Sequence, residues 1–226
     1  MWSSQPHLST SSASVYLDAY LVLANATART SRVKLGSSVI VLPSRHPIVQ
    51  AKILTTLDAL SNGRVIFGLS VGGIESEYHA LGVPFAHRGT LADEMIQVIQ
   101  ELWASDNPSF QGKHYGFSDI KFGPKPVQQP GIPMWIGGGT DGGLRSAARY
   151  GDAWHPIISA VDAIKPGMKT FAETWRQAGR RGEPQVNVLF GCRIFQTPLA
   201  SDQEIGMGSA EQVLQNLIAV RDLAIS

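Results

Sequence analysis

The segment from residue 133 to 140 contains the residues best suited to bind an anion. It reads Pro-Met-Trp-Ile-Gly-Gly-Gly-Thr, a short apolar run that ends in three glycines and a threonine. Because Gly137, Gly138 and Gly139 have no Cβ, their backbone N–H groups can approach a ligand closely. A helical segment follows Thr140, and a helix N-terminus adds a positive partial charge. The pattern predicts a phosphate-binding loop, the alternative being an ordinary tight turn between a strand and a helix.

A glycine pair, Gly72 and Gly73, follows an apolar and β-branched run at 64–71. Two residues without side chains at the end of a strand allow the backbone to approach a ligand. The alternative is a loop pair with no function beyond its turn. Residues 133–140 and this pair therefore define two candidate sites, each at the end of an expected strand.

The composition excludes several classes of function. The 226 residues carry a formal net charge of +1 from 19 basic and 18 acidic side chains, so we expect no nucleic-acid partner and no anionic membrane surface. The single cysteine, Cys192, excludes a disulfide within the chain and favours a reducing, cytoplasmic location. No Cys/His cluster has zinc-ligand spacing, so no metal is expected. Apolar runs are strand-length, and residues 1–14 lack a secretory signal pattern.

Hydrophobic periodicity and turn residues predict the elements that must position these glycines. Helices are expected at 15–29, 47–61, 74–81, 91–104, 144–150, 161–180 and 211–224, and strands at 32–42, 64–71, 134–136, 153–158 and 186–195. The alternation predicts parallel βαβ units, and strands apolar on both faces indicate a sheet covered by helices. Five strands are too few for a complete eight-stranded barrel.

Local signals fix several of the expected helix ends. Pro47 suits a first helical position, and Asn62 with Gly63 tolerates the left-handed geometry of a helix end. Capping boxes are predicted from two pairs, Thr90 with Asp93 and Ser209 with Gln212. Residues 105–132 are long for a plain connection and contain two short extended pieces at 113–117 and 120–122, so we expect an excursion from the domain there.

Several of these segments also recur together in one known family. They are residues 56–64, the pattern Glu-Tyr…Leu-Gly-Val-Pro-Phe…Arg-Gly…Asp-Glu from 77 to 94, residues 125–128 leading into 133–138, and Gly-Asp-Ala-Trp at 151–154. In this order and spacing they resemble the luciferase-like monooxygenase family, and most closely its branch that uses coenzyme F420, a deazaflavin. The similarity covers roughly residues 20–157 and is weaker beyond about 186.

The resemblance implies an α/β fold of the TIM (β/α)8-barrel type, with a flavin or deazaflavin at the C-terminal ends of the strands. The family's first strand and helix, most or all of its second strand and its last strand have no counterpart here. We therefore expect a truncated barrel that forms a single domain over residues 1–226, with the excursion at about 105–132. Open sheet edges predict a homodimer or an unstable monomer.

The resemblance also implies roles for particular residues. At Ser38 and Val39 it implies a non-proline cis peptide or a bulge that backs the tricyclic ring, the alternative being an ordinary buried strand. Gly72 and Gly73 fall in a loop that contacts the cofactor, and Gly73 stands where related deazaflavin enzymes can carry an acidic catalytic residue. Glu75 is nearby but not aligned.

Five further side chains are assigned a functional or a structural interpretation. His7 matches a family histidine near the reactive edge of the ring and is the candidate proton relay, although Pro6 precedes it where the family has an acid. The alternative is an N-terminal histidine without a role. Trp154 is expected either to wall the cofactor pocket or to be a core aromatic. A structural charge network is expected for Glu77, Arg88 and Glu94.

Three functions follow as hypotheses. The first is an oxidoreductase that moves hydride between F420 and a small organic substrate, with the cofactor supplying the chemistry. The second is an FMN-dependent monooxygenase of the same family. The third is a catalytically silent protein that binds the cofactor or acts as a scaffold. A Rossmann dinucleotide site is disfavoured because no strand is followed by GxGxxG.

Overall fold

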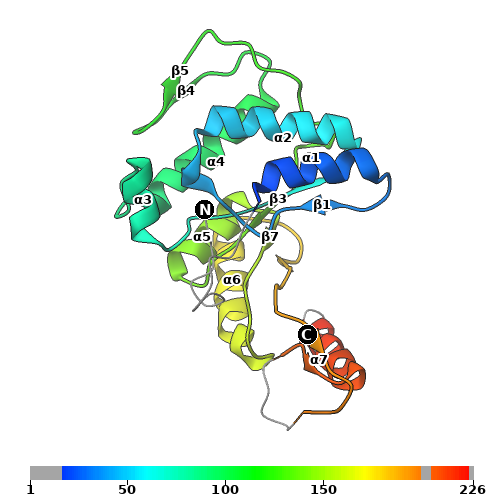
Figure 1. Ribbon diagram of the computed structural model, residues 1–226. Helices are drawn as coiled ribbons and strands as arrows, with labels where there is room; N and C mark the ends of the chain where they lie inside the picture. The colour runs from blue at the N-terminus through cyan, green and yellow to red at the C-terminus, as the bar shows by residue number, and fades with distance from the viewer. Residues whose placement is uncertain (1–16, 200–204, 224–226) are drawn as a thin grey trace. The chain divides into compact units, whose positions relative to one another are not determined.

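The computed structural model describes residues 17–199 and 205–223, which form an α/β fold of helices and mainly parallel strands (Figure 1). His7, the candidate proton relay, lies outside the described residues. The chain divides into two compact units, unit 1 at residues 1–135 and unit 2 at residues 136–226. No helix among the described residues has the length and apolar character needed to cross a membrane.

Unit 1 contains the longest strand and the longest helix. Its helices are α1 (Ala19–Arg29), the 3-10 helix η1 (Leu42–Ser44), α2 (Pro47–Ser61), α3 (Glu75–Leu81) and α4 (Arg88–Ala104). Its strands are β1 (Leu35–Gly36), β2 (Ile40–Val41), β3 (Val65–Ser70), β4 (Phe110–Gln111) and β5 (Gly116–Phe117). Strand β6 (Met134–Ile136) lies at the division between the units.

The strand expected at 32–42 is broken into two pieces. Both β1 and β2 pair parallel with β3, Leu35 opposite Val65 and Ile40 opposite Leu69. Residues 37–39 between them belong to no strand, although the Ser37 N–H still donates to the Ile66 carbonyl at 3.3 Å. The Phe67 N–H of β3 donates to the Pro133 carbonyl at 2.8 Å, directly before β6. The central strand β3 thus has parallel neighbours, and the gap beside it falls at the expected bulge.

Helices α1 and α2 run side by side over strands β1 and β3 (Figure 1). Pro47 opens α2, and Asn62 ends it in the left-handed region at φ 56°, as its sequence predicted. The apolar faces of the helices and of β3 form the core of unit 1, whose fully buried side chains include Leu54, Phe67, Leu69, Met95, Ile99 and Leu102. Their burial supplies the main stabilisation of this unit.

The start of α4 differs from its prediction. The helix begins at Arg88 and its N-cap, His87, makes no side-chain capping bond. Thr90 therefore lies inside the first turn, where its hydroxyl donates to the His87 carbonyl at 3.1 Å. The capping box expected from Thr90 and Asp93 is wrong, because the helix extends one turn further towards the N-terminus.

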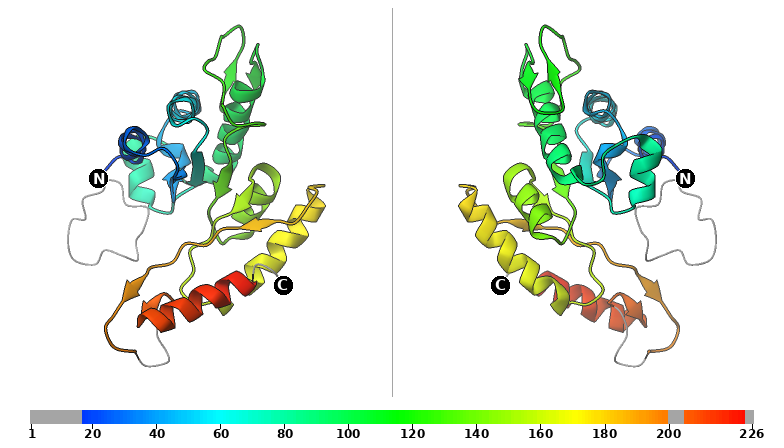
Figure 2. Two further views of the ribbon diagram at one scale, coloured as in Figure 1. Left: turned by 90° about the vertical axis from the view of Figure 1, so that its right-hand side faces the viewer. Right: turned by 90° about the vertical axis from the view of Figure 1, so that its left-hand side faces the viewer.

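The excursion contains the antiparallel hairpin of β4 and β5, which stands out from the helices of unit 1 (Figure 2). The Glu94 carboxylate of α4 holds it by accepting the backbone N–H groups of Lys113, His114 and Tyr115 at 3.1, 2.7 and 2.7 Å. Burial alone would raise the pKa of Glu94, but these three donors outweigh it and hold the pKa below its usual value. Glu94 thus anchors the hairpin, a role that the sequence analysis did not predict. The extended piece expected at 120–122 forms no strand.

A buried carboxylate fixes the other end of the excursion. Asp58 of α2 is fully buried and accepts the backbone N–H groups of Val127 and Gln128 at 2.8 and 3.2 Å. The Gln128 side-chain amide donates to the same carboxylate at 2.8 Å and also to the Val65 carbonyl. Two of the segments that carry the family resemblance therefore meet at a structural contact.

Unit 2 contains helices α5 (Asp141–Tyr150), α6 (Lys165–Gln177), α7 (Ala210–Leu223) and the 3-10 helix η2 (Asp162–Ile164). Its strands are β7 (Ala153–Trp154), β8 (Gln185–Val186), β9 (Arg193–Ile194) and β10 (Met207–Gly208). Strand β7 pairs parallel with β8, and the His155 N–H donates to the Ile136 carbonyl at the end of β6. The Ser209–Gln212 capping box is confirmed, with bonds of 2.9 and 3.3 Å.

The strand expected at 186–195 is also split. Residues 185–186 pair with β7, whereas residues 193–194 pair parallel with β10 in a separate two-stranded sheet. Side chains in and between these two pieces are exposed or half-buried. The apolar residues of this segment therefore do not form the continuous buried strand that the sequence predicted.

Candidate functional site

The break between β1 and β2 is the first candidate ligand-facing feature of unit 1. The Ser38–Val39 peptide bond is cis, which confirms the geometry expected there. The neighbouring Ser37 hydroxyl donates to the Gly68 carbonyl at 2.8 Å and accepts the Gly68 N–H at 3.1 Å. A Cβ on Gly68 would lie 1.7 Å from the Ser37 carbonyl oxygen, so only glycine fits opposite the break. The Ser38 side chain lies at an exposed position on this break.

The loop at residues 71–73 follows β3 in the same unit. Gly72 has φ 66°, and a Cβ there would lie 2.9 Å from Cγ1 of Val41, the last residue of β2. Gly73 is exposed, and a Cβ there would meet no atom within 4 Å. The two glycines therefore differ: Gly72 is required by its conformation and its packing, whereas Gly73 opens to free space.

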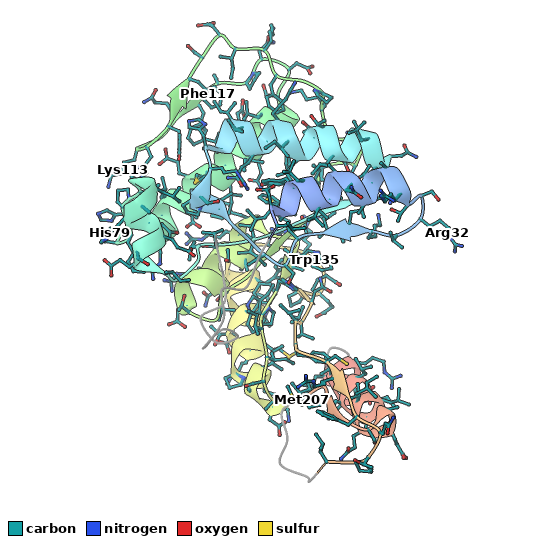
Figure 3. The ribbon with its side chains drawn as sticks, viewed as in Figure 1. Arg32, His79, Lys113, Phe117, Trp135 and Met207 are labelled. Atoms are coloured by element: carbon teal, nitrogen blue, oxygen red, sulfur yellow. The ribbon has the colours of Figure 1, made fainter. Side chains whose placement is uncertain are left out.

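Helix α3 supports this loop through a buried tyrosine. The Tyr78 hydroxyl donates to the Val71 carbonyl, and Tyr78 is only 2% exposed. His79, the next residue, lies on the exposed side of α3 (Figure 3). Burial raises the pKa of Tyr78 to about 12, although the nearby Arg88 cation lowers it in part. The hydroxyl is therefore a neutral donor at ordinary pH.

The loop at residues 137–140 follows β6 and belongs to unit 2. Gly138 has φ 125°, and both Gly138 and Gly139 are exposed. Thr140 is the N-cap of α5, where its hydroxyl accepts the Gly143 N–H at 3.2 Å. A Cβ on Gly139 would meet nothing within 4 Å. The loop thus presents bare backbone at the positive end of a helix, the arrangement expected of a phosphate cradle.

Trp154 holds the 137–140 loop through a hydrogen bond to its backbone. Its indole Nε1–H donates to the Gly138 carbonyl at 2.7 Å, and the side chain is 3% exposed. Helix α6 covers the ring, because a Cβ on Gly167 would lie 2.4 Å from it, and the Phe171 ring centroid is 5.8 Å away. Trp154 is therefore a core aromatic, one of the two interpretations given in the sequence analysis. Its indole N–H also holds the loop.

The predicted site residues fall into two groups. In unit 1, two of them, Ser38 and Val39, lie directly before β2, and two, Gly72 and Gly73, lie in the loop after β3. The second group lies in unit 2 and consists of Gly137, Gly138, Gly139, Thr140 and Trp154. Within the described ranges no group of three or more His, Cys, Asp or Glu side chains has the arrangement of a metal site.

Sequence reasoning missed the residues that hold the unit 1 group in place. Ser37 binds both backbone groups of Gly68, and Tyr78 binds the carbonyl before Gly72. The one signal that pointed to Tyr78 was its place in the Glu-Tyr motif of the family pattern. Nothing local to Ser37 distinguishes it from its neighbour Ser38.

Comparison with known proteins decides the family. The family model described as luciferase-like monooxygenase matches residues 1–205. The chain belongs to the luciferase-like monooxygenase family. An uncharacterised protein of Mycobacterium tuberculosis is 37% identical over 175 residues, which cover 76% of this chain and 61% of that protein. The chain thus spans about three fifths of the length of this relative.

Solved structures of the same fold support the architecture. An F420-dependent secondary alcohol dehydrogenase, in complex with an F420–acetone adduct, has a TM-score of 0.75 and 17% identity over 92% of this chain and 76% of its own. A riboflavin lyase with modified FMN and riboflavin has a TM-score of 0.71 and 18% identity over 91% of this chain and 49% of its own. The fold is therefore the α/β type of the TIM-barrel luciferase-like enzymes, and the strands of residues 17–199 and 205–223 do not close a barrel.

Proposed function

We propose that this protein is an oxidoreductase that binds coenzyme F420 and moves hydride between the deazaflavin and a small organic substrate. The observation that carries the proposal is the 137–140 loop, whose exposed residues Gly138 and Gly139 stand at the N-terminus of α5 in a chain of the luciferase-like family. Such a loop suits a phosphate group, which F420 and FMN share. The cofactor, when bound, supplies hydride chemistry at its ring.

The residues present fit such a cofactor. The open space at Gly139 and the φ of 125° at Gly138 leave room for an anion close to the backbone, and Thr140 offers a hydroxyl. Backbone N–H donors and the helix end stabilise the negative charge of a phosphate. Trp154 contributes by holding the Gly138 carbonyl, which keeps the loop backbone in one conformation. Each of these roles belongs to unit 2 alone.

Unit 1 supplies the residues that we assign to the ring. The Ser38–Val39 bond is cis, and in the 71–73 loop Gly73 leaves open space at the position of a Cβ. We assign Ser38, Val39, Gly72 and Gly73 to contacts with the ring by analogy with the family. His7 is assigned the proton relay, as the family pattern implies, because an imidazole transfers protons near neutral pH.

FMN is the second candidate cofactor. The riboflavin lyase structure, which contains a modified FMN, has nearly the same TM-score as the F420-dependent dehydrogenase. With FMN the proposed reaction is a monooxygenation instead of a hydride transfer. A catalytically silent cofactor-binding protein is the third candidate, favoured by the open sheet among the described residues.

We also propose that two copies of the chain associate. Among the described residues β1 and β2 pair with β3 alone, so one edge of each has no strand beside it. Unpaired strand edges promote association. A cytoplasmic location is part of the proposal because Cys192, the one cysteine, is exposed and free. Light scattering that shows a stable monomer would reject the dimer.

Gly139→Asp tests the phosphate cradle most sharply. An aspartate fits sterically, because a Cβ at this position meets no atom within 4 Å, but its charge repels a phosphate. We expect the affinity for F420 or FMN to fall at least tenfold while the melting temperature stays unchanged. Gly191→Asp is the matched control, because Gly191 is exposed and equally open in the same unit. Equal affinities for the two variants would overturn the assignment of the loop.

Turnover is tested separately with the wild-type chain. Reduced F420 is mixed with a panel of organic electron acceptors, and the return of the oxidised absorbance band is followed. A rate above the cofactor-only background supports the oxidoreductase. Tight binding without any rate supports the silent protein.

A further inference from the structure

The Tyr78 hydroxyl of α3 contacts the backbone just beyond the end of β3. It donates to the Val71 carbonyl, which is the first carbonyl after β3 ends at Ser70. Up to Ser70 the strand is held by its pairing with β2, where Val41 lies opposite Ser70. Beyond that point the backbone pairs with no strand of residues 17–199 and 205–223. Tyr78 therefore fixes the chain at the place where it leaves the sheet and enters the glycine loop.

Tyr78 itself is held rigidly. Its ring meets Phe85 edge-on, with centroids 5.2 Å apart at 78°. The guanidinium of Arg88 lies 3.9 Å from the Phe85 centroid, on the start of α4. The Arg88 Nη1–H also donates to the Phe85 carbonyl at 3.1 Å. The Tyr78 side chain thus packs against Phe85, which in turn packs against Arg88. Its conformation is therefore already ordered before a ligand binds, and binding loses no further entropy at this side chain.

The 71–73 loop is held on further sides as well. The Gly72 N–H donates to the Ser70 hydroxyl at 3.3 Å, and a Cβ on Gly72 would lie 2.9 Å from Val41 Cγ1. Gly73 alone is left exposed, with open space at the position of a Cβ. The restraints therefore converge on Gly72 and present the backbone of Gly73 outward.

We propose that Tyr78 is a positioning residue for the cofactor site, whose hydroxyl fixes the 71–73 loop so that the Gly73 backbone faces the ring of a deazaflavin or flavin. The proposal rests on the proposed function for the identity of the ligand. It assigns Tyr78 no contact with the cofactor and no proton transfer. Its effect is to reduce the conformational freedom that the loop would lose on binding.

The test compares Tyr78→Phe with Tyr20→Phe in the whole chain. Tyr20 is also buried in unit 1, and its hydroxyl donates to the Gln50 side chain at 2.8 Å, not to a carbonyl of the 71–73 loop. Both variants lose one buried hydrogen bond, so their melting temperatures should fall by similar amounts. Two quantities are then measured: backbone amide hydrogen exchange of residues 71–74 without cofactor, and the Kd for F420 and for FMN from the change in ring fluorescence.

We expect Tyr78→Phe to speed exchange in residues 71–74 and to weaken cofactor binding about fivefold, the factor that corresponds to one net hydrogen bond. Tyr20→Phe should change neither quantity. Faster amide exchange with an unchanged Kd would overturn the proposal, because it would show that ordering the loop does not affect cofactor binding. A weaker Kd with unchanged exchange would also overturn it, since Tyr78 would then act other than through the loop.

Failure of the proposed function gives a different result. If the wild-type chain binds neither F420 nor FMN, the cofactor assignment fails and this inference fails with it. If the wild-type chain binds one of them and Tyr78→Phe binds it equally well, the inference alone is rejected.

Discussion

The 71–73 loop after β3 and the 137–140 loop after β6 are held by the same device. In each, an aromatic side chain donates one hydrogen bond to a carbonyl of the loop: Tyr78 to Val71, and Trp154 to Gly138. Both donors are almost fully buried and come from a later element of the chain. A loop of glycines has many backbone conformations, so a buried donor that selects one of them lowers the entropic cost of ligand binding.

The two loops differ in the surface that they present. The 71–73 loop packs on Val41 and leads into α3, whose N-cap, Ile74, makes no side-chain capping bond. The 137–140 loop leads into α5, which Thr140 caps. Gly138 and Gly139 are exposed there, whereas Gly137 is buried. The first loop is therefore suited to lie flat against a ring, and the second is suited to surround an anion. The flanking side chains thus set the two glycine loops apart.

The largest expected effect separates the two glycines of the 71–73 loop. Gly72→Ala places a Cβ 2.9 Å from Val41 Cγ1 at a φ of 66°, so we expect a loss of about 2–5 kcal/mol in the free energy of unfolding and the loss of cofactor binding. Gly73→Ala, which meets no atom, should change stability by less than about 0.5 kcal/mol. Chemical denaturation measures both, and equal losses would show that the packing on Val41 does not exist.

Trp154→Phe tests whether the second loop is held as the first one is. The variant leaves the Gly138 carbonyl without its indole donor, so stability should fall by about 1–3 kcal/mol and the Kd for cofactor should rise. Trp175→Phe is the control, because Trp175 is equally buried in unit 2 and donates to the Gly182 carbonyl instead. If Trp175→Phe weakens binding as much as Trp154→Phe does, the loop contact has no special role.

Thr140→Ala removes the side-chain helix cap, which the 71–73 loop lacks. Loss of the cap bond to the Gly143 N–H should cost about 0.5–2 kcal/mol of stability, and loss of the hydroxyl should also weaken cofactor binding. Thr140→Ser keeps the hydroxyl and should restore both. Binding that is lost in the alanine variant and is not recovered in the serine variant would contradict a role for the hydroxyl.

The smallest effect comes from the charge beside the cradle. Asp141 is exposed in the first turn of α5, where its carboxylate favours the helix but repels an anion. Asp141→Asn should therefore tighten cofactor binding about two- to fivefold at low salt, and the gain should shrink as ions screen the charge. Asp152→Asn, at another exposed position of unit 2, should change little. Weaker binding by Asp141→Asn would argue against a bound anion at this helix end.

Features encoded by neighbouring residues were predictable from the sequence. Pro47 and Asn62 marked the ends of α2, and Ser209 with Gln212 formed the expected capping box. The strand β6 and the glycines after it were also found, because an apolar run that ends in glycine is a local pattern. These signals need no knowledge of what packs against them.

Features that depend on distant partners were not predictable. Asp58 and Gln128 meet across 70 positions, and Glu94 reaches backbone groups 19 to 21 residues further along the chain. The sequence predicted one continuous strand at 32–42 because its residue types favour a strand throughout. The break lies where Ser37 bonds to Gly68, 31 positions further along the chain. The contact of Tyr78 with Val71 belongs to the same class, since only the fold brings a helix side chain to that carbonyl.

The most direct test of the central claim is a fluorescence titration of the purified chain with F420 and, in parallel, with FMN. The account predicts saturable binding of F420, tighter than that of FMN, and a loss of that binding in Gly139→Asp but not in Gly191→Asp. Saturable binding of FMN alone would contradict the choice of ring and would leave the phosphate cradle intact. Binding of neither compound would contradict the claim that this chain holds a flavin-type cofactor.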